Sequence, residues 1–135
     1  PGTALPEPSL RALLTACCAV LAGACAELEA GTNADVVDLV NCCLCLLINV
    51  TERDARVRRL AAATECRGAP LIPFLARVFG AQLEGGTTSG NIVAAYTALL
   101  LGCLTVRHGE NRDAVREALR ARLPPDAGCP MVRLV

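Results

Sequence analysis

The sequence predicts an all-α protein, an armadillo/HEAT-like helical-repeat solenoid fragment, from its composition, its periodicity and an internal repeat. Apolar residues make up 53% of the 135 residues and aromatic residues only 2%. Strands draw on aromatic and β-branched residues, so this Ala-, Leu- and Cys-rich composition favours packed helices. Apolar side chains recur at helical spacing, and no β-alternation of useful length is present. The length fits one domain, residues 1–135.

Two long helices are expected in the first third of the chain. The first runs from about Ser9, which is a candidate N-cap, to Ala30. The second begins after Thr32 or Asn33 and ends near Thr51, with apolar side chains repeating at helical spacing. Both helices are strongly apolar, so we expect them to pack in the core.

A short helix and a proline-led helix are expected next. Residues Asp54–Thr64 place apolar side chains on one face and arginines on the other. The segment Cys66–Pro70 is a break, and Pro70 opens a helix that ends near Glu84. Proline suits the first turn of a helix because its missing N–H has no partner there in any case.

The last third of the chain predicts a flexible loop and two further helices. The loop is Gly85–Gly90, and the helix Asn91–Val106 follows it. Because Asn91–Val106 is apolar nearly all round, we expect it in the middle of the packing. The sixth helix, Asn111–Leu123, is amphipathic and is ended by Pro124.

The chain contains an internal repeat. The stretches Arg53–Leu60 (RDARVRRL) and Arg112–Leu119 (RDAVREAL) share Arg, Asp, Ala and a final Leu. Each follows a long apolar helix and precedes a proline-led apolar segment, at Pro73 and at Pro130. Such units bury their apolar faces by stacking on neighbours. Both ends therefore look like cuts in a longer solenoid, and we expect an exposed apolar face on the isolated chain.

Two sets of segments resemble known families. The stretches Gly68–Phe79 (GAPLIPFLARVF) and Leu46–Val50 (LLINV) resemble the first and third helices of armadillo repeats. A closer resemblance is to the C-terminal part of the wings-apart-like (Wapl) cohesin-release factors. It rests on IVAAYTALLLGCL (Ile92–Leu104), ENRDAVREALRARLP (Glu110–Pro124) and LCLLINVTERDARVRRL (Leu44–Leu60), in the same order as in that family.

The Wapl resemblance implies a function without catalysis. Proteins of this family are helical-repeat scaffolds that bind cohesin subunits and accessory factors and promote release of cohesin from chromosomes. By this resemblance we expect a nuclear, chromatin-associated protein that acts in chromosome segregation and sister chromatid cohesion. The alternatives are a generic armadillo-type adaptor that binds an extended peptide and, more weakly supported, a membrane-associated helical bundle.

Charge and hydropathy favour protein partners over other ligands. The 13 basic residues balance the 13 acidic ones, so no bulk attraction to nucleic acid or to an anionic membrane is expected. The longest charge-free helical stretches are shorter than the roughly 20 residues that a membrane span needs. We therefore expect no direct nucleic-acid contact, no membrane and no small-molecule substrate.

Candidate catalytic and metal residues are few. His108 is the only histidine and lies at a helix end, where we expect a cap or a surface residue whose cationic form would suit the helix dipole. Most of the nine cysteines lie in apolar helical stretches, which predicts small core side chains in a reducing compartment, the cytosol or nucleus. Cys42, Cys43 and Cys45 point in different directions on a helix and form no zinc pattern. We expect no enzyme activity, no cofactor and no metal.

The first group of candidate partner-binding residues surrounds the end of the second helix. Asn49 would hydrogen-bond either a bound extended peptide, as in armadillo-like repeats, or a neighbouring helix, and we favour the second interpretation. Arg53, Arg56 and Arg59 belong to a cluster of arginines that forms either a solvated face or a patch for an acidic partner. No aromatic residue lies among these arginines, which argues against stacking of single-stranded nucleic acid.

The second group opens the fifth helix. Asn91 is a candidate cap, and Ile92 and Val93 follow directly from the glycine-rich loop. An isoleucine at an exposed first turn is a plausible interface anchor. The alternative is that Ile92 packs beneath the loop, and the Wapl resemblance favours contact with a partner.

Overall fold

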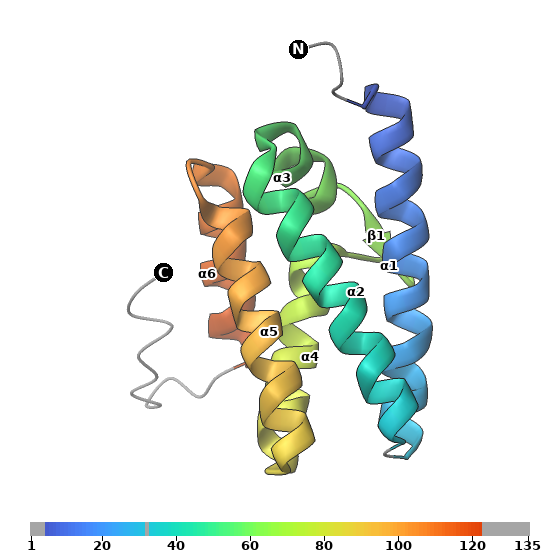
Figure 1. The fold of residues 1–135 in the computed structure, drawn as a ribbon. Helices are drawn as coiled ribbons and strands as arrows, with labels where there is room; N and C mark the ends of the chain where they lie inside the picture. Colours follow the sequence, from blue (N-terminus) through green and yellow to red (C-terminus); the bar gives the residue numbers. More distant parts are fainter. Residues whose placement is uncertain (1–4, 32, 123–135) are drawn as a thin grey trace.

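A computed structural model describes residues 5–31 and 33–122, and within these ranges the predicted all-α class is confirmed (Figure 1). Each predicted helix is present, with ends shifted by a few residues. The helices are α1 (Glu7–Ala30), α2 (Ala34–Arg53), α3 (Ala55–Ala62), α4 (Leu71–Gly85), α5 (Thr88–Thr105) and α6 (Gly109–Arg122).

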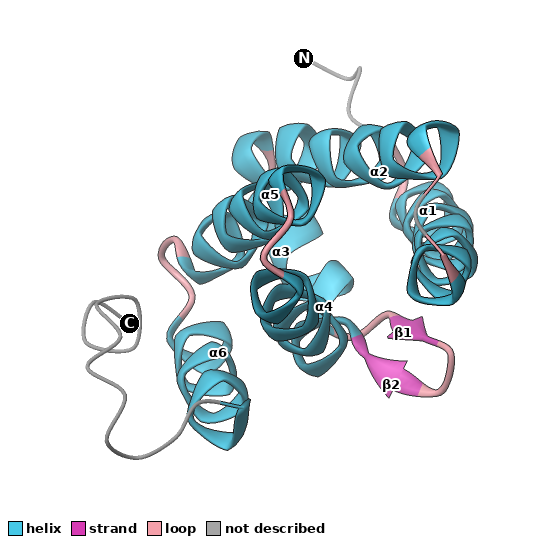
Figure 2. Ribbon diagram, turned by 90° about the horizontal axis from the view of Figure 1, so that it is seen from below, coloured by secondary structure: helices cyan, strands magenta, loops and turns pink. Residues whose placement is uncertain are grey.

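The helices form two antiparallel pairs. α1 packs against α2, and α4 packs against α5, while α2 and α5 lie side by side and run in the same direction (Figure 1). Seen along the helices, α2 and α5 form the upper edge of the molecule, and α4 and α6 lie below them (Figure 2). α6 contacts both α4 and α5. Each pair is thus followed by a polar helix, α3 of 8 residues after the first pair and α6 of 14 residues after the second.

Local chemistry explains where the first helices begin. Asn33 caps α2 by accepting a hydrogen bond from the backbone N–H of Asp35 at 2.8 Å. Asp54 caps α3 in the same way, accepting from the N–H of Arg56 at 2.9 Å. The prediction of Ser9 as a cap is wrong, because α1 already begins at Glu7 after Pro6 and continues through Ser9.

The predicted break before α4 is a small β-hairpin. Strand β1 (Glu65–Cys66) pairs antiparallel with β2 (Ala69–Pro70). The two residues between the strands have positive φ, 52° at Arg67 and 80° at Gly68. Two successive positive φ angles are typical of the tight turn that matches the twist of paired strands. Cys66 lies in strand β1 and not in a helix, yet its side chain is buried in the core.

The start of α5 differs from the prediction. Thr87, not Asn91, is the cap: its Oγ1 accepts a hydrogen bond from the N–H of Gly90 at 2.9 Å. Part of the expected loop therefore belongs to the helix. Gly90 is buried against α4, where an added Cβ would lie 2.8 Å from the carbonyl oxygen of Gln82.

The two RDA-bearing stretches occupy different positions in their helices. Asp54 stands at the junction of α2 and α3, whereas Asp113 lies inside α6. The difference arises because α6 begins one turn earlier, at Gly109, where His108 supplies the cap. The second stretch is therefore wholly helical, and the first spans a helix junction.

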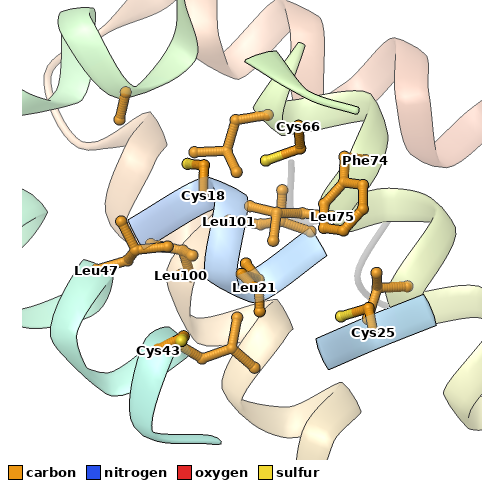
Figure 3. Packing of buried hydrophobic residues seen from close by; sticks show 14 of the residues in the cluster. Cys18, Leu21, Cys25, Cys43, Leu47, Cys66, Phe74, Leu75, Leu100 and Leu101 are labelled. Carbon is orange, nitrogen blue, oxygen red and sulfur yellow. The ribbon is translucent and has the colours of Figure 1, made fainter. Parts of the chain in front are cut away.

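The core is a single cluster of aliphatic side chains and thiols drawn from every helix (Figure 3). In Figure 3 Leu100 of α5 lies next to Leu47 of α2, and Leu101 of α5 lies next to Leu75 and Phe74 of α4. Two buried threonines, Thr51 and Thr97, satisfy their hydroxyls by donating to carbonyls one turn earlier in their own helices. The core thus needs no other polar partner at these two positions.

Candidate interaction surface

An apolar surface runs along the outward side of α2 and α5, and we call it the α2/α5 face. Ile92 and Leu99 on α5 are 45% and 54% exposed, and Val106, the residue that follows α5, is 46% exposed. Leu39 and Leu46 on α2 are 45% and 43% exposed. The α2/α5 face consists of Leu39, Cys42, Leu46 and Asn49 on α2 and of Ile92, Ala95, Leu99, Gly102 and Val106 on α5. Exposed apolar side chains in this number on two neighbouring helices are typical of a contact site.

The spacing of residues in α5 produces this surface. The α5 residues of the face recur every three or four positions and so lie along one line of the helix. The opposite line, with Val93, Thr97, Leu100 and Leu104, is fully buried. The prediction that this helix lies in the middle of the packing is therefore correct for three of its sides, toward α2, α4 and α6, while its outward side is open. An exposed apolar face, as expected for the chain, is present.

Asn49 and Arg53 lie together at one end of the face, beside a hollow of about 330 Å³. The hollow is also lined by residues from the start of α1, Leu5 and Leu10, and by the α2–α3 junction. Asn49 is exposed, and its side chain makes no hydrogen bond within residues 5–31 and 33–122. The preferred interpretation, that Asn49 bonds a neighbouring helix, is therefore wrong for the described residues.

Arg56 and Arg59 have internal partners. The Nη2 of Arg56 lies 2.9 Å from Asp54 Oδ2, and its Nη1 donates to the carbonyl of Leu5 at 3.1 Å. The hydrogen bond to Asp54 raises the pKa of Arg56 and lowers that of the Asp54 carboxyl. Arg59 lies 3.6 Å from Glu7. These two arginines therefore hold the start of α1 in the described structure, and Arg53 is the more available cation.

The residues at the start of α5 lie far from this group. Because α2 and α5 run parallel, Asn91 and Ile92 sit at the opposite end of the face from Asn49. Asn91 is exposed and Ile92 is 45% exposed, whereas Val93 is completely buried. The structure thus brings Ile92 into an apolar row with Leu99 and removes Val93 from the surface.

His108 caps α6. Its Nδ1 accepts a hydrogen bond from the backbone N–H of Asn111 at 3.1 Å. The predicted cap is confirmed. The ring caps the start of α6, and the positive end of a helix dipole does not favour a cation there, so the expected dipole interaction is wrong.

Asn111 is a structural residue that the sequence reasoning missed. Its side chain is 4% exposed, and Nδ2 donates both to the carbonyl of Arg58 at 3.1 Å and to that of Leu104 at 2.9 Å. Asn111 thereby joins α6 to α3 and to α5. An asparagine in the first turn of a polar helix is an ordinary surface pattern, so the sequence held no signal of this role.

The thiols behave mainly as core side chains. Cys17, Cys18, Cys25, Cys43 and Cys66 are buried, Cys45 and Cys103 are partly exposed, and Cys42 is exposed. Burial raises the pKa of Cys17 to about 12 and that of Cys25 to about 11. The side-chain hydrogen bond with Cys66 raises the pKa of Cys18 (both residues are labelled in Figure 3). Cys129 lies outside the described residues.

The described residues contain no group of three or more metal-ligating side chains close enough to share an ion.

Comparisons with protein-family models, curated proteins and solved structures find no match to the chain. Three helices, α1, α2 and α5, are long and apolar enough to cross a membrane by length and composition alone. α1 and α2 exceed the charge-free stretches of the sequence because they include charged residues. α5 exceeds its stretch because it begins at Thr88, before the predicted start at Asn91.

Proposed function

We propose that the chain is a non-enzymatic, Wapl-like helical-repeat scaffold that binds cohesin and promotes its release from chromosomes. The observation that carries the proposal is the open α2/α5 face on two parallel helices that occupy corresponding places in the repeated order of elements. A stack of this kind presents one helix per unit on a common surface, which suits contact with another protein. The Wapl-like segment Leu44–Leu60 covers the second half of α2 and most of α3, and Ile92–Leu104 covers most of α5.

The proposal assigns the nucleus and chromatin as the place of action. Its partners are cohesin subunits and accessory factors, and it requires neither a cofactor nor a metal. The armadillo/HEAT-like solenoid arrangement is part of the same proposal. It is supported by the parallel α2 and α5 and by the contacts of α6 with the second helix pair.

A pull-down with purified cohesin subunits and accessory factors tests this function. We expect the folded chain to retain at least one subunit and Leu46→Asp to reduce that retention by about tenfold, since a charge would be buried at the contact. Leu83→Asp is the matched control, because Leu83 is a 45% exposed leucine on α4 outside the face. A folded chain that retains no subunit contradicts the cohesin proposal.

The alternative, an adaptor for an extended peptide, is favoured by one observation. Asn49 and Arg53 line the 330 Å³ hollow, and neither has a hydrogen-bond or ion-pair partner among the described residues. An extended acidic peptide would offer backbone groups to the amide and carboxylates to the guanidinium. We expect Asn49→Ala to weaken such a peptide about tenfold in fluorescence anisotropy, with Asn91→Ala unchanged. Equal binding by both variants excludes this adaptor site.

A further inference from the structure

We propose that the α2/α5 face binds a single amphipathic α-helix of another protein, about four turns long and antiparallel to α2 and α5. This inference goes beyond cohesin binding, and it concerns the chemistry of the face whichever protein carries the helix. It depends on the length of the apolar row, on the charges at its two ends and on what the face offers to a ligand backbone.

The apolar row sets the length of the partner. The row begins at Ile92 on α5 and ends at Val106, the residue that follows the helix, and at 1.5 Å per residue they lie about 21 Å apart. Leu39 and Leu46 stand beside this row on the neighbouring α2. Ala95 and Gly102 are the small residues between the larger ones and leave room for inserted side chains. A helix of about 16 residues with apolar side chains three and four apart covers this row.

Opposite charges mark the two ends of the face. Asp35 and Asp38 are exposed where α2 begins, and Arg53 and Arg107 are exposed where α2 and α5 end. None of these four has an ion-pair partner in the described part of the chain. Glu52 and Glu110 are also exposed near the second end, so the net charge of that end decides nothing. Asp35 and Arg53 are the charges that continue the line of Leu39 and Leu46 on α2, because they follow it at steps of three and four residues.

This charge pattern fixes the direction of the bound helix. Helices favour acidic residues in their first turn and basic residues in their last. An antiparallel helix therefore places its acidic start beside Arg53 and Arg107, and its basic end beside Asp35 and Asp38. A parallel helix of the same type would bring like charges together at both ends.

The face suits a helix better than an extended chain. Between its ends the face offers apolar side chains, Cys42 and small residues, with Asn49 and Asn91 near opposite ends as its amides. An extended peptide laid across it would leave its backbone N–H and C=O groups without partners away from water. In a helix most backbone N–H and C=O groups are hydrogen-bonded to each other, so a bound helix needs only apolar side-chain contacts with the face.

The test uses a fluorescent peptide of about 16 residues, with leucines at helical spacing, glutamates in the first turn and lysines in the last. A second peptide of equal composition has the glutamates and lysines exchanged. In fluorescence anisotropy with the intact chain, we expect the first peptide to bind about tenfold more tightly than the second. Equal affinities, or no saturable binding of the first peptide, overturn the proposal.

Variants of the chain place the contact. We expect Leu99→Asp to weaken the first peptide by about tenfold or more, and Leu83→Asp on α4 to leave its affinity unchanged. The double variant Asp38→Arg/Arg53→Glu should reduce or reverse the preference between the two peptides. Circular dichroism confirms that each variant is folded. Peptide binding that survives Leu99→Asp overturns the proposal. Binding to phosphatidylcholine vesicles that depends on Leu99, with no binding of the peptide, also overturns it and would show that the face binds lipid.

Discussion

The side chain of Asn111 links three helices, α3, α5 and α6. Its amide reaches the carbonyls of two other helices and has little contact with solvent. A buried carbonyl that loses its hydrogen-bond donor has no water molecule to replace it. The free-energy cost of removing that carbonyl from water is then not offset by any hydrogen bond.

We therefore expect Asn111→Ala to lower the free energy of unfolding by about 1–3 kcal/mol. Urea denaturation followed by circular dichroism measures the change. Asn91→Ala is the control, because Asn91 is exposed and its replacement should change stability by less than about 0.5 kcal/mol. Equal effects of the two variants would show that the Asn111 hydrogen bonds do not stabilise the packing of α6.

At the scale of single helices, two glycines of α5 have opposite environments. Gly90 is buried, and a Cβ there would lie 2.8 Å from the Gln82 carbonyl oxygen and 2.9 Å from Thr87 Oγ1. Gly102 is exposed, with no atom within 4 Å of the same position. Gly90 thus allows α5 to begin against the end of α4, whereas Gly102 makes no such close contact within the fold.

The two substitutions should accordingly change stability in opposite directions. We expect Gly90→Ala to destabilise the fold by about 1–3 kcal/mol, because a backbone carbonyl must move. Gly102→Ala should stabilise it by about 0.5–1 kcal/mol through the higher helix propensity of alanine. Thermal unfolding of both variants checks this, and a neutral Gly90→Ala would mean that α4 and α5 separate at no cost.

Element positions could be predicted from the sequence wherever one local signal dominated. Asn33 and Asp54 mark helix starts because each has a side-chain oxygen within reach of the N–H two residues later. Ser9 and Asn91 carry the same kind of side chain, yet each lies inside a helix that begins earlier. Several cap candidates compete at both places, and the position of α5 against α4 at Gly90 is a tertiary contact that the local sequence does not contain.

The surface was harder to predict than the helices. Ile92 could be singled out from its place after a glycine-rich loop, but its row with Leu99 and Val106 appears only once the outward side of α5 is known. Val93 is apolar and adjacent, and its burial follows from the direction of α4. Asn49 and Ile92 belong to opposite ends of one face because α2 and α5 run parallel, which is a property of the topology.

At the scale of the whole molecule, thiols help to fill the core that joins the two helix pairs. Cys17 on α1 lies 3.8 Å from the carbonyl oxygen of Cys43 on α2, and Cys25 packs in the same buried cluster. A thiol fills such space as a small apolar side chain only while it keeps its proton. Ionisation would place a charge in the apolar core, which is why burial raises the pKa of both groups.

The stability of the fold should therefore fall in alkaline solution. In the unfolded chain Cys17 and Cys25 lose their protons near the ordinary pKa of 9.0, while in the folded chain they hold them to about 12 and about 11. Above pH 9 the unfolded state binds fewer protons than the folded state, so the free energy of unfolding decreases as the pH rises. Below that pH both states are protonated at these thiols, and their contribution to stability is fully present.

Urea denaturation at about pH 7, 9 and 10.5 in a reducing buffer measures this dependence. Cys17→Ala and Cys25→Ala should each reduce the alkaline loss, because alanine fills part of the same space and has no proton to lose. Cys42→Ala is the matched control, since Cys42 is exposed on the α2/α5 face and should leave the slope unchanged. A wild-type stability that is constant from pH 7 to pH 10.5, with both variants parallel to it, would contradict a core that depends on protonated thiols.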